Sequence, residues 1–393
     1  MNPTTVLVTV SGHDRPGVTA ALFSALAAHD ADVLDVEQVV VRDRLVLAVL
    51  LALQGDPSAL RSSVTSAAAA LGVEAEVSES SPGSEHVGTG RRSHVIVIGR
   101  PLRAGVIGDI AQRLAELGAN IESIALLSTE PATALELLVR AEDHTLLRGV
   151  LVQAAEDLGV DIAVEPAGLR RRATRLVVLD VDSTLIKDEG IDVLAERAGV
   201  AEQVVALTEQ AMAGELDFAD SLRARVALLE GLPEQVVYEV RDGLTLTPGA
   251  RTFVRTLKRL GYAVGVVSGG FTIFTDRFVA ELGLDFAAAN VLEVVDGKLT
   301  GRVLGDVVDR GGKAAALRRF AEERGVPLTQ TVAVGDGAND IDMLKTAGLG
   351  IAFNGKAALR AAADTSVNLP YLDTVLFVLG ITRDEIDEAL ADS

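Results

Sequence analysis

The stretch 175–186 constrains the fold of this chain more than any other part of the sequence. After Arg175 it has four consecutive apolar residues, 176–179, which is typical of a short strand buried on both faces of a parallel sheet. The carboxylates of Asp180 and Asp182 and two hydroxyls follow at once. Ligands of open α/β sheets bind at the carboxyl ends of the strands, and crowded oxygen atoms suit a hard cation such as Mg2+. The stretch therefore predicts a cation site at the end of a parallel strand.

Two other apolar strands end in polar residues. The strand expected at 263–267 ends at Ser268, and the strand expected at 331–334 ends just before Asp336. Because the carboxyl ends of parallel strands lie at one edge of a sheet, we expect both residues to lie close to Asp180.

Lys313, at the start of a predicted helix, and Asp340, shortly after Asp336, complete a set of four motifs. Together these motifs resemble those of the haloacid dehalogenase-like phosphohydrolases, and their spacing resembles the phosphoserine phosphatases among them. The resemblance covers the chain from about residue 175 to its C-terminus. It implies a Rossmann-like parallel sheet over 174–393, with a helical cap inserted at about 190–247.

The resemblance also implies a role for each motif. Asp180 would be the nucleophile, and Asp182 would protonate the leaving oxygen and later take a proton from water. One Mg2+ would be held by Asp180, by the main-chain carbonyl of Asp182 and by Asp336, with Asp340 in support. The residues implied to hold the phosphoryl group are Ser268, Gly269 and Lys313, and Asn339 is a further implied substrate-binding residue.

The expected cap contains a candidate substrate pocket. O-phospho-L-serine carries an ammonium and a carboxylate, so its pocket needs an anion and a cation at opposite ends. Glu189 could take the ammonium and Arg225 could bind the carboxylate through two hydrogen bonds. Met212 and Phe218 would supply apolar walls. Alternatively, Glu189 and Arg225 are ordinary solvent-facing charges of helices.

A glycine pattern at Gly335-x-Gly337 offers a different interpretation, a dinucleotide-binding loop. The third glycine of such a loop is replaced by Asp340, and Asp336 stands where a pyrophosphate would need bare amides. The sequence therefore disfavours nucleotide binding of this type.

The N-terminal half contains one structural plan twice, which indicates an internal duplication. Each copy has the order β-α-β-β-α-β of a ferredoxin-like fold. The first copy has expected strands at 4–10, 32–41, 45–53 and 73–77 and helices at 18–28 and 57–71. The second copy has expected strands at 93–99, 121–128, 134–141 and 161–164 and helices at 107–117 and 145–158.

The loop that precedes the first helix carries Arg15-Pro-Gly17 in one copy and Arg103-Ala-Gly105 in the other. This repeated loop resembles that of ACT domains, which bind amino acids. The resemblance implies an amino-acid effector, with L-serine favoured, close to Gly17 and to Gly105 or Gly108 in the expected loop. Alternatively, these glycines serve tight turns. Because the edge strands of such modules tend to pair, a homodimer is also expected.

These patterns divide the chain into three domains. The ACT-like modules are expected at 1–80 and 93–168, with a linker rich in serine, glycine and proline at 81–92. The phosphatase domain is expected at 174–393. Three consecutive arginines at 170–172 could suggest nucleic-acid binding, but at a domain junction a solvated hinge is favoured.

Composition excludes several classes of function. The 393 residues carry a formal net charge of −20, which argues against binding to nucleic-acid phosphates. The sequence has no cysteine, so disulfides, thiol nucleophiles and cysteine zinc sites are excluded. No secretory signal and no apolar run long enough for a membrane span is apparent, so we expect a cytoplasmic protein without a membrane partner.

The sequence thus favours an enzyme that hydrolyses O-phospho-L-serine to L-serine and phosphate, the last step of serine biosynthesis. The reaction would pass through a phospho-aspartate intermediate and would need Mg2+. One alternative is a phosphatase for another small phosphomonoester. An alternative of a different class is a non-catalytic amino-acid sensor that retains the phosphatase fold.

Overall fold

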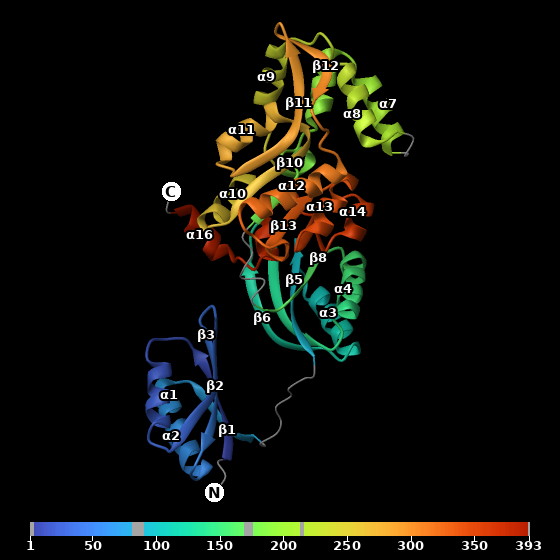
Figure 1. Cartoon of the computed structure of the whole chain (residues 1–393). Helices are drawn as coiled ribbons and strands as arrows, with labels where there is room; N and C mark the ends of the chain where they lie inside the picture. Colours follow the sequence, from blue (N-terminus) through green and yellow to red (C-terminus); the bar gives the residue numbers. More distant parts are fainter. Residues whose placement is uncertain (1–3, 81–89, 169–175, 213–215, 392–393) are drawn as a thin grey trace. The chain divides into compact units, whose positions relative to one another are not determined.

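The computed structural model describes residues 4–80, 90–168, 176–212 and 216–391 (Figure 1). The chain forms two compact units, Met1–Val87 and Gly88–Ser393. Most of the expected linker and all of the arginines at 170–172 lie outside the described residues.

The first unit is a four-stranded antiparallel sheet with the strand order β2-β3-β1-β4. Its elements are β1 (Thr4–His13), α1 (Val18–Leu26), β2 (Ala31–Val41), β3 (Arg44–Leu53), α2 (Pro57–Leu71) and β4 (Glu74–Ser80). Alternate residues of β1, such as Val6 and Val8, are buried in one core with residues of both helices. This arrangement confirms the predicted ferredoxin-like plan.

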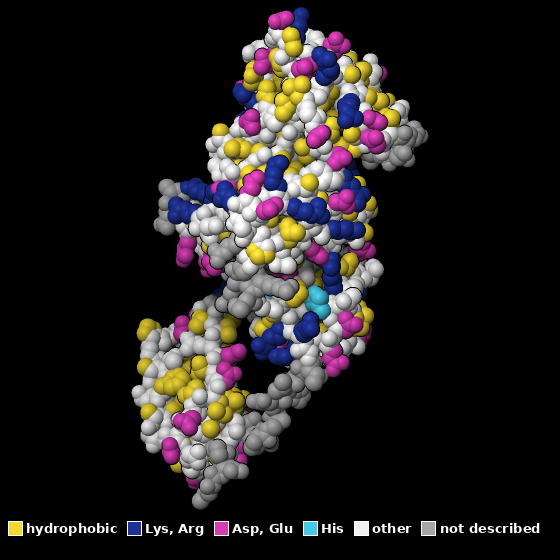
Figure 2. Space-filling model, viewed as in Figure 1, with side chains coloured by type: hydrophobic (Ala, Val, Ile, Leu, Met, Phe, Trp, Pro, Cys, Tyr) yellow, Lys and Arg dark blue, Asp and Glu magenta, His cyan; other side chains and the backbone are white. Residues whose placement is uncertain are grey.

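Hydrophobic side chains gather on one exposed face of this unit (Figure 2). The exposed large hydrophobic residues of β2 and β3 are Val33, Leu34, Val36, Val39, Val40, Val41 and Val46. Because β2 is an edge strand, its outer hydrogen-bonding side is available for pairing with another strand.

The second unit begins with another sheet of the same plan, in the order β6-β7-β5-β8. Its elements are β5 (Arg91–Gly99), α3 (Ala104–Glu116), β6 (Asn120–Ser128), β7 (Thr133–Ala141), α4 (His144–Leu158) and β8 (Asp161–Pro166). Helix α3 begins earlier than expected, so Gly105 and Gly108 lie in its first turns and the prediction that they belong to a loop is wrong. The reason is that Val106 and Ile107, which pack against the core of this module, extend the apolar face of Ile110 and Leu114 back into the first turn.

The rest of the second unit contains a seven-stranded sheet in the order β12-β11-β10-β9-β13-β14-β15. Six of the described strands run parallel to one another: β11, β10, β9, β13, β14 and β15. Strand β12, at the edge, is antiparallel to β11. The strands are β9 (Leu176–Leu179), β10 (Ala263–Phe271), β11 (Phe286–Val295), β12 (Lys298–Leu304), β13 (Thr331–Gly335), β14 (Leu349–Phe353) and β15 (Thr365–Val367). The predicted Rossmann-like parallel sheet is confirmed.

All four residues of β9 are buried because helices cover both faces of the sheet. Val177 and Leu179 point into one core and Leu176 and Val178 into a second core on the opposite face. The helices of this sheet are α10 (Ala250–Arg259), α11 (Thr272–Leu282), α12 (Arg310–Glu323), α13 (Ile341–Thr346), α14 (Ala357–Ala362), α15 (Val375–Val378) and α16 (Arg383–Ala391).

The insertion after β9 is helical, as expected. It consists of α6 (Gly190–Ala198), α7 (Ala201–Met212), α8 (Phe218–Ala227) and α9 (Glu234–Gly243). The β11–β12 hairpin joins this cap, since Gly231 donates a backbone hydrogen bond to Leu299 and Leu299 donates one to Leu232. Among the described residues, no helix is both long and apolar enough to cross a membrane.

Candidate active site

Three neighbouring parallel strands bring the predicted motifs to one edge of the sheet. Strand β9 lies between β10 and β13, with Leu179 in register with Val266 and with Val334. Asp180 and Asp336 directly follow their strands, and Ser268 lies near the end of β10. The predicted convergence of these three positions is therefore observed.

Lys313 lies at the centre of the site and is fully buried. Its Nζ atom is 2.7 Å from Oδ1 of Asp180 and 2.7 Å from Oδ1 of Asp340. Burial alone would lower the pKa of Lys313, but the two carboxylates raise this pKa above its ordinary value. The lysine is therefore positively charged, and it offsets part of the negative charge of the site.

Asp180 is 3% exposed. Burial raises the pKa of Asp180 well above its ordinary value, and the charge of Asp340 raises it further, while Lys313 opposes this shift. Oδ1 also accepts a hydrogen bond of 2.7 Å from the backbone N–H of Val181. Because a nearby cation favours the charged form of a carboxylate, a divalent cation at the site would lower this pKa.

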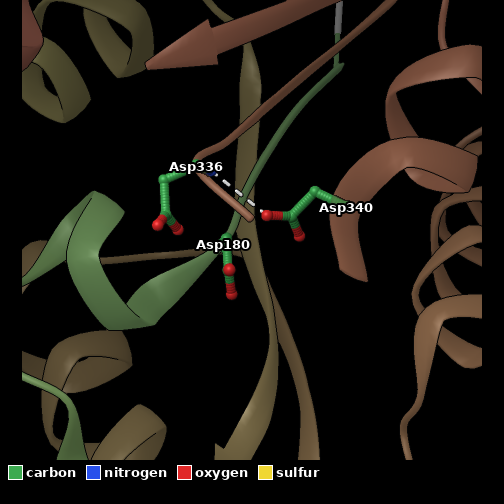
Figure 3. Close-up of side chains that lie close together, drawn as sticks. All are labelled: Asp180, Asp336 and Asp340. Carbon is green, nitrogen blue, oxygen red and sulfur yellow. Dashed lines mark hydrogen bonds between the residues drawn. The ribbon is translucent and has the colours of Figure 1, made fainter. Parts of the chain in front are cut away.

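The carboxylates of Asp180, Asp336 and Asp340 lie close together (Figure 3), and ligand oxygens from all three lie within 4.8 Å of each other. An all-oxygen set of this kind fits Mg2+. Oδ2 of Asp340 accepts hydrogen bonds from the backbone N–H groups of Asp336 and Gly337, while its Oδ1 contacts Lys313. Asp340 thus contacts Lys313 and the loop of Asp336 through both oxygens.

Asp336 is the more accessible of these carboxylates. Burial raises its pKa to about 6, Asp340 adds to this shift, and Lys313 and Lys356 oppose it. Thr184, in the turn after β9, donates a hydrogen bond of 3.4 Å from its hydroxyl to Oδ1 of Asp336.

Asp182 lies in the turn after β9 and connects the sheet to the cap. Its Oδ1 accepts a hydrogen bond of 2.8 Å from the N–H of Gly190, the first residue of α6. Its Oδ2 accepts one of 3.0 Å from the hydroxyl of Ser268. Gly270 lies so close that a Cβ atom there would be 2.9 Å from Oδ2 of Asp182. The side chain is therefore held in one orientation from two sides.

Gly269 is covered by a cap residue. A Cβ atom at this position would lie 2.9 Å from the ring of Phe218, so the glycine allows the cap to approach the sheet closely. Its carbonyl accepts a hydrogen bond of 2.8 Å from the side-chain amide of Asn290, which is 1% exposed. Asn290 was missed by the sequence analysis, because its position in an apolar hairpin strand carries no motif.

Glu189 lies at the junction of the turn and the cap. Ser183, whose φ of 56° is unusual for a residue other than glycine, donates a hydrogen bond of 2.9 Å to its Oε1. The surrounding protein raises the pKa of Glu189 to about 7 by desolvation, although part of the residue is exposed, and the charge of Asp182 adds to this shift. Glu189 therefore changes its charge close to neutral pH.

Arg225, on α8, is influenced by three carboxylates of the site. Burial lowers its pKa, and the charges of Asp192, Glu189 and Asp182 oppose this shift. The sequence analysis did not anticipate Asp192, which lies in the first turn of α6. Arg225 thus belongs to the electrostatic environment of Glu189 and Asp182.

Two predicted positions remain. Asn339 lies in the turn before α13, and a Cβ atom on Gly337 would be 2.2 Å from its Oδ1, so the amide packs against the loop that carries Asp336. Met212 ends α7, and its side chain lies outside the part of the chain that the structure describes.

Comparison with known families agrees with this geometry. Residues 177–345 match the haloacid dehalogenase-like hydrolases, and residues 4–78 and 92–165 each match an ACT domain. A phosphoserine phosphatase of Streptomyces coelicolor is 56% identical over 99% of this chain and 95% of its own length. A phosphoserine phosphatase of Mycobacterium tuberculosis is 53% identical over 98% of this chain and 95% of its own length.

A solved structure of a phospho-aspartyl intermediate analogue of phosphoserine phosphatase is 46% identical, with a TM-score of 0.50. It covers 52% of this chain and 98% of its own. The fold and the site define a haloacid dehalogenase-like phosphatase that carries two ACT domains. Given the identity over nearly the full length of its relatives, the chain belongs to the phosphoserine phosphatase family.

Proposed function

We propose that this enzyme hydrolyses O-phospho-L-serine to L-serine and phosphate. This reaction would be the last step of serine biosynthesis. The observation that carries the proposal is the ion pair between Lys313 and Asp180 beside the Asp182–Ser268 hydrogen bond. It combines a buried carboxylate, a cation and a second carboxylate at one edge of the sheet. The names of the full-length relatives support the choice of substrate.

In the first step, a carboxylate oxygen of Asp180 attacks phosphorus and the bond between phosphorus and the serine oxygen breaks. We assign Oδ2 to this attack, because Oδ1 is held by Val181 and Lys313. Asp182 gives its proton to the departing serine oxygen. The products of this step are L-serine and a phospho-aspartate at Asp180.

In the second step, water attacks phosphorus and the bond to Asp180 breaks, which restores its carboxylate. Asp182 takes a proton from the water, so the same group acts first as an acid and then as a base. The hydrogen bonds from Gly190 and Ser268 hold Asp182 in place for both transfers.

A bound Mg2+ would neutralise charge between the phosphate and the carboxylates. We propose that Asp180, Asp336 and the main-chain carbonyl of Asp182 hold this ion, with Asp340 in support. Ser268, the N–H of Gly269, Lys313 and Asn339 would then bind the phosphoryl oxygens.

Glu189 and Arg225 are proposed to bind the ammonium and the carboxylate of the substrate, respectively. The support is electrostatic: the charges of Glu189 and Asp182 act on the pKa of Arg225, and the charge of Asp182 also acts on the pKa of Glu189. Phe218, which covers Gly269, would form an apolar wall of the pocket together with Met212.

A phosphate-release assay with and without EDTA tests the reaction. We expect turnover of phosphoserine that depends on Mg2+, loss of turnover in Asp180→Asn, and label on Asp180 after rapid acid quenching of 32P-phosphoserine. If glycerol phosphate or phenyl phosphate is hydrolysed equally well, the enzyme is a phosphatase for another small phosphomonoester. If no ester is hydrolysed, the chain is a sensor without catalysis.

We further propose that residues 1–80 and 93–168 are regulatory ACT modules that bind an amino acid, most simply L-serine, and that 174–393 is the phosphatase domain. Gly17, with a φ of 99° at the start of α1, is a position that only glycine adopts readily. The exposed edge strand β2 supports self-association as a homodimer.

A further inference from the structure

The second ACT module does not present its open sheet face to solvent. Ile96, Ile98 and Ala134 of this face are at most 1% exposed. They belong to the same hydrophobic core as Leu372 and Val375, which follow β15 of the phosphatase sheet. The module and the phosphatase are therefore packed together through a continuous apolar contact.

A pair of hydrogen bonds lies at the edge of this contact. Oδ2 of Asp161, the first residue of β8, accepts a bond of 2.9 Å from the backbone N–H of Asn368, and its Oδ1 accepts one of 2.7 Å from the side-chain amide. Asp161 is buried, so both of its oxygens depend on Asn368. Nearby, the hydroxyl of Thr365 donates to the carbonyl of Ile162 at 3.2 Å.

The segment that contains Asn368 also forms hydrogen bonds with the loop at 354–356, which contacts the candidate metal site. The N–H of Asn354 donates a hydrogen bond of 2.8 Å to the carbonyl of Val367, and its side-chain amide donates one of 3.4 Å to Leu369. Asn354 has a φ of 47°, which is uncommon for a residue other than glycine. The segment on either side of Asn368 therefore fixes an unusual backbone conformation.

This loop reaches Asp336 directly. Two residues after Asn354, the N–H of Lys356 donates a hydrogen bond of 3.0 Å to the carbonyl of Asp336. Hydrogen bonds joined by two short backbone stretches, 367–369 and 354–356, thus connect Asp161 in the ACT module with the backbone of Asp336.

We propose that Asp161 is a positioning residue for the metal ligand Asp336, so that the second ACT module is a structural part of the metal site. The proposal rests on the function proposed above, in which Asp336 holds Mg2+. Asp161 does not touch the substrate or the cation. It acts by holding Asn368, and through Asn368 it sets the position of the loop that contacts Asp336.

The test is the affinity of the full-length protein for Mg2+, measured by isothermal titration calorimetry without substrate. Asp161→Ala removes both bonds, and we expect Mg2+ to bind about three- to tenfold more weakly. In Asp161→Asn the new side-chain oxygen accepts from the backbone N–H of Asn368, and the new NH2 group donates to the side-chain oxygen of Asn368 once that amide rotates. Both bonds are retained, so the affinity of this variant for Mg2+ should be close to that of the wild type. Asp157→Ala, which loses an ion pair with Arg113 and a hydrogen bond from Gln153 at the surface of the same module, is the matched control.

Asn368→Ala is a second variant if Asp161→Ala does not fold, because it removes only the side-chain bond from the phosphatase side. If Asp161→Ala folds, it decides: weaker Mg2+ binding, with normal binding in Asp161→Asn and Asp157→Ala, supports the proposal, and wild-type affinity overturns it. If Asp161→Ala does not fold, Asn368→Ala decides by the same two outcomes. If the wild type itself binds no Mg2+, the proposed metal site fails first.

Discussion

The side chains of Lys313 and Asp180 form an ion pair with 2.7 Å between Nζ and Oδ1, at a position where both side chains are buried. The two residues come from α12 and from the end of β9, far apart in the sequence. Their contact places a fixed positive charge against the proposed nucleophile.

Replacing Lys313 by methionine removes this charge but keeps much of the side-chain volume. We expect kcat to fall by about 10²- to 10³-fold, because charge on the phosphoryl group is no longer stabilised. Two buried carboxylates also lose their partner, so the free energy of unfolding in urea should fall by about 3–5 kcal/mol. Lys258→Met, which breaks the pair with Asp285 away from the site, is the control and should retain kcat.

Glu189 predicts a pH dependence. Its pKa is raised to about 7, and only its ionised form attracts the ammonium of phosphoserine. The value of kcat/KM should therefore decrease as the pH falls through about 7, and approach about a tenfold loss per pH unit below it. N-acetyl-phosphoserine, which lacks the ammonium, should not show this change. An identical profile for Glu189→Gln would contradict the assignment.

Arg225 predicts substrate selectivity. Arg225→Ala should lower kcat/KM for phosphoserine by about 10²-fold, because the carboxylate of the substrate loses a charged partner in a largely buried position. Hydrolysis of phenyl phosphate, which has no carboxylate, should change little. Arg223→Ala, on the same helix with 58% of its side chain exposed, provides the matched control. Unchanged selectivity in Arg225→Ala would favour another phosphomonoester as the substrate.

Asp188 connects the two segments that join the cap to the sheet. Its Oδ2 accepts hydrogen bonds from the N–H of Thr245 at 2.8 Å and from the Thr245 hydroxyl at 3.0 Å. Asp188→Ala should raise KM for phosphoserine by about tenfold, because the neighbouring Glu189 loses its support. Asp188→Asn keeps an acceptor oxygen and should recover most of the loss. Asp242→Ala, at the cap surface, should leave KM unchanged.

Gly108 tests regulation by L-serine. It lies in the first turns of α3, and outside the backbone of its own helix no atom crowds the position that a Cβ would take. Gly108→Ala should stabilise the helix by up to about 1 kcal/mol and weaken inhibition by L-serine, since a methyl group blocks close approach of the ligand to the backbone. Gly149→Ala, a helix glycine of the same module with equally open surroundings, should leave inhibition unchanged.

The elements of the fold could be predicted because their apolar periodicity is local. The run at 176–179 and the alternation in β1 each indicate strands without knowledge of any partner. The start of α3 was predicted incorrectly, because two glycines suggested a loop, whereas Val106 and Ile107 between them pack against the core of the module and belong to the helix. Asn290 and Asp161 carry no motif, so only their contacts in the folded chain identify them.

The sequence by itself determined the duplicated ferredoxin-like plan, the parallel sheet and the polar residues at its strand ends, because these follow from side-chain periodicity and short motifs. Only the tertiary structure decided that Lys313 pairs with both Asp180 and Asp340, that Phe218 covers Gly269, and that the second ACT module is packed against the phosphatase. Contacts between residues distant in sequence depend on the packing of whole elements against one another, and no local pattern encodes that packing.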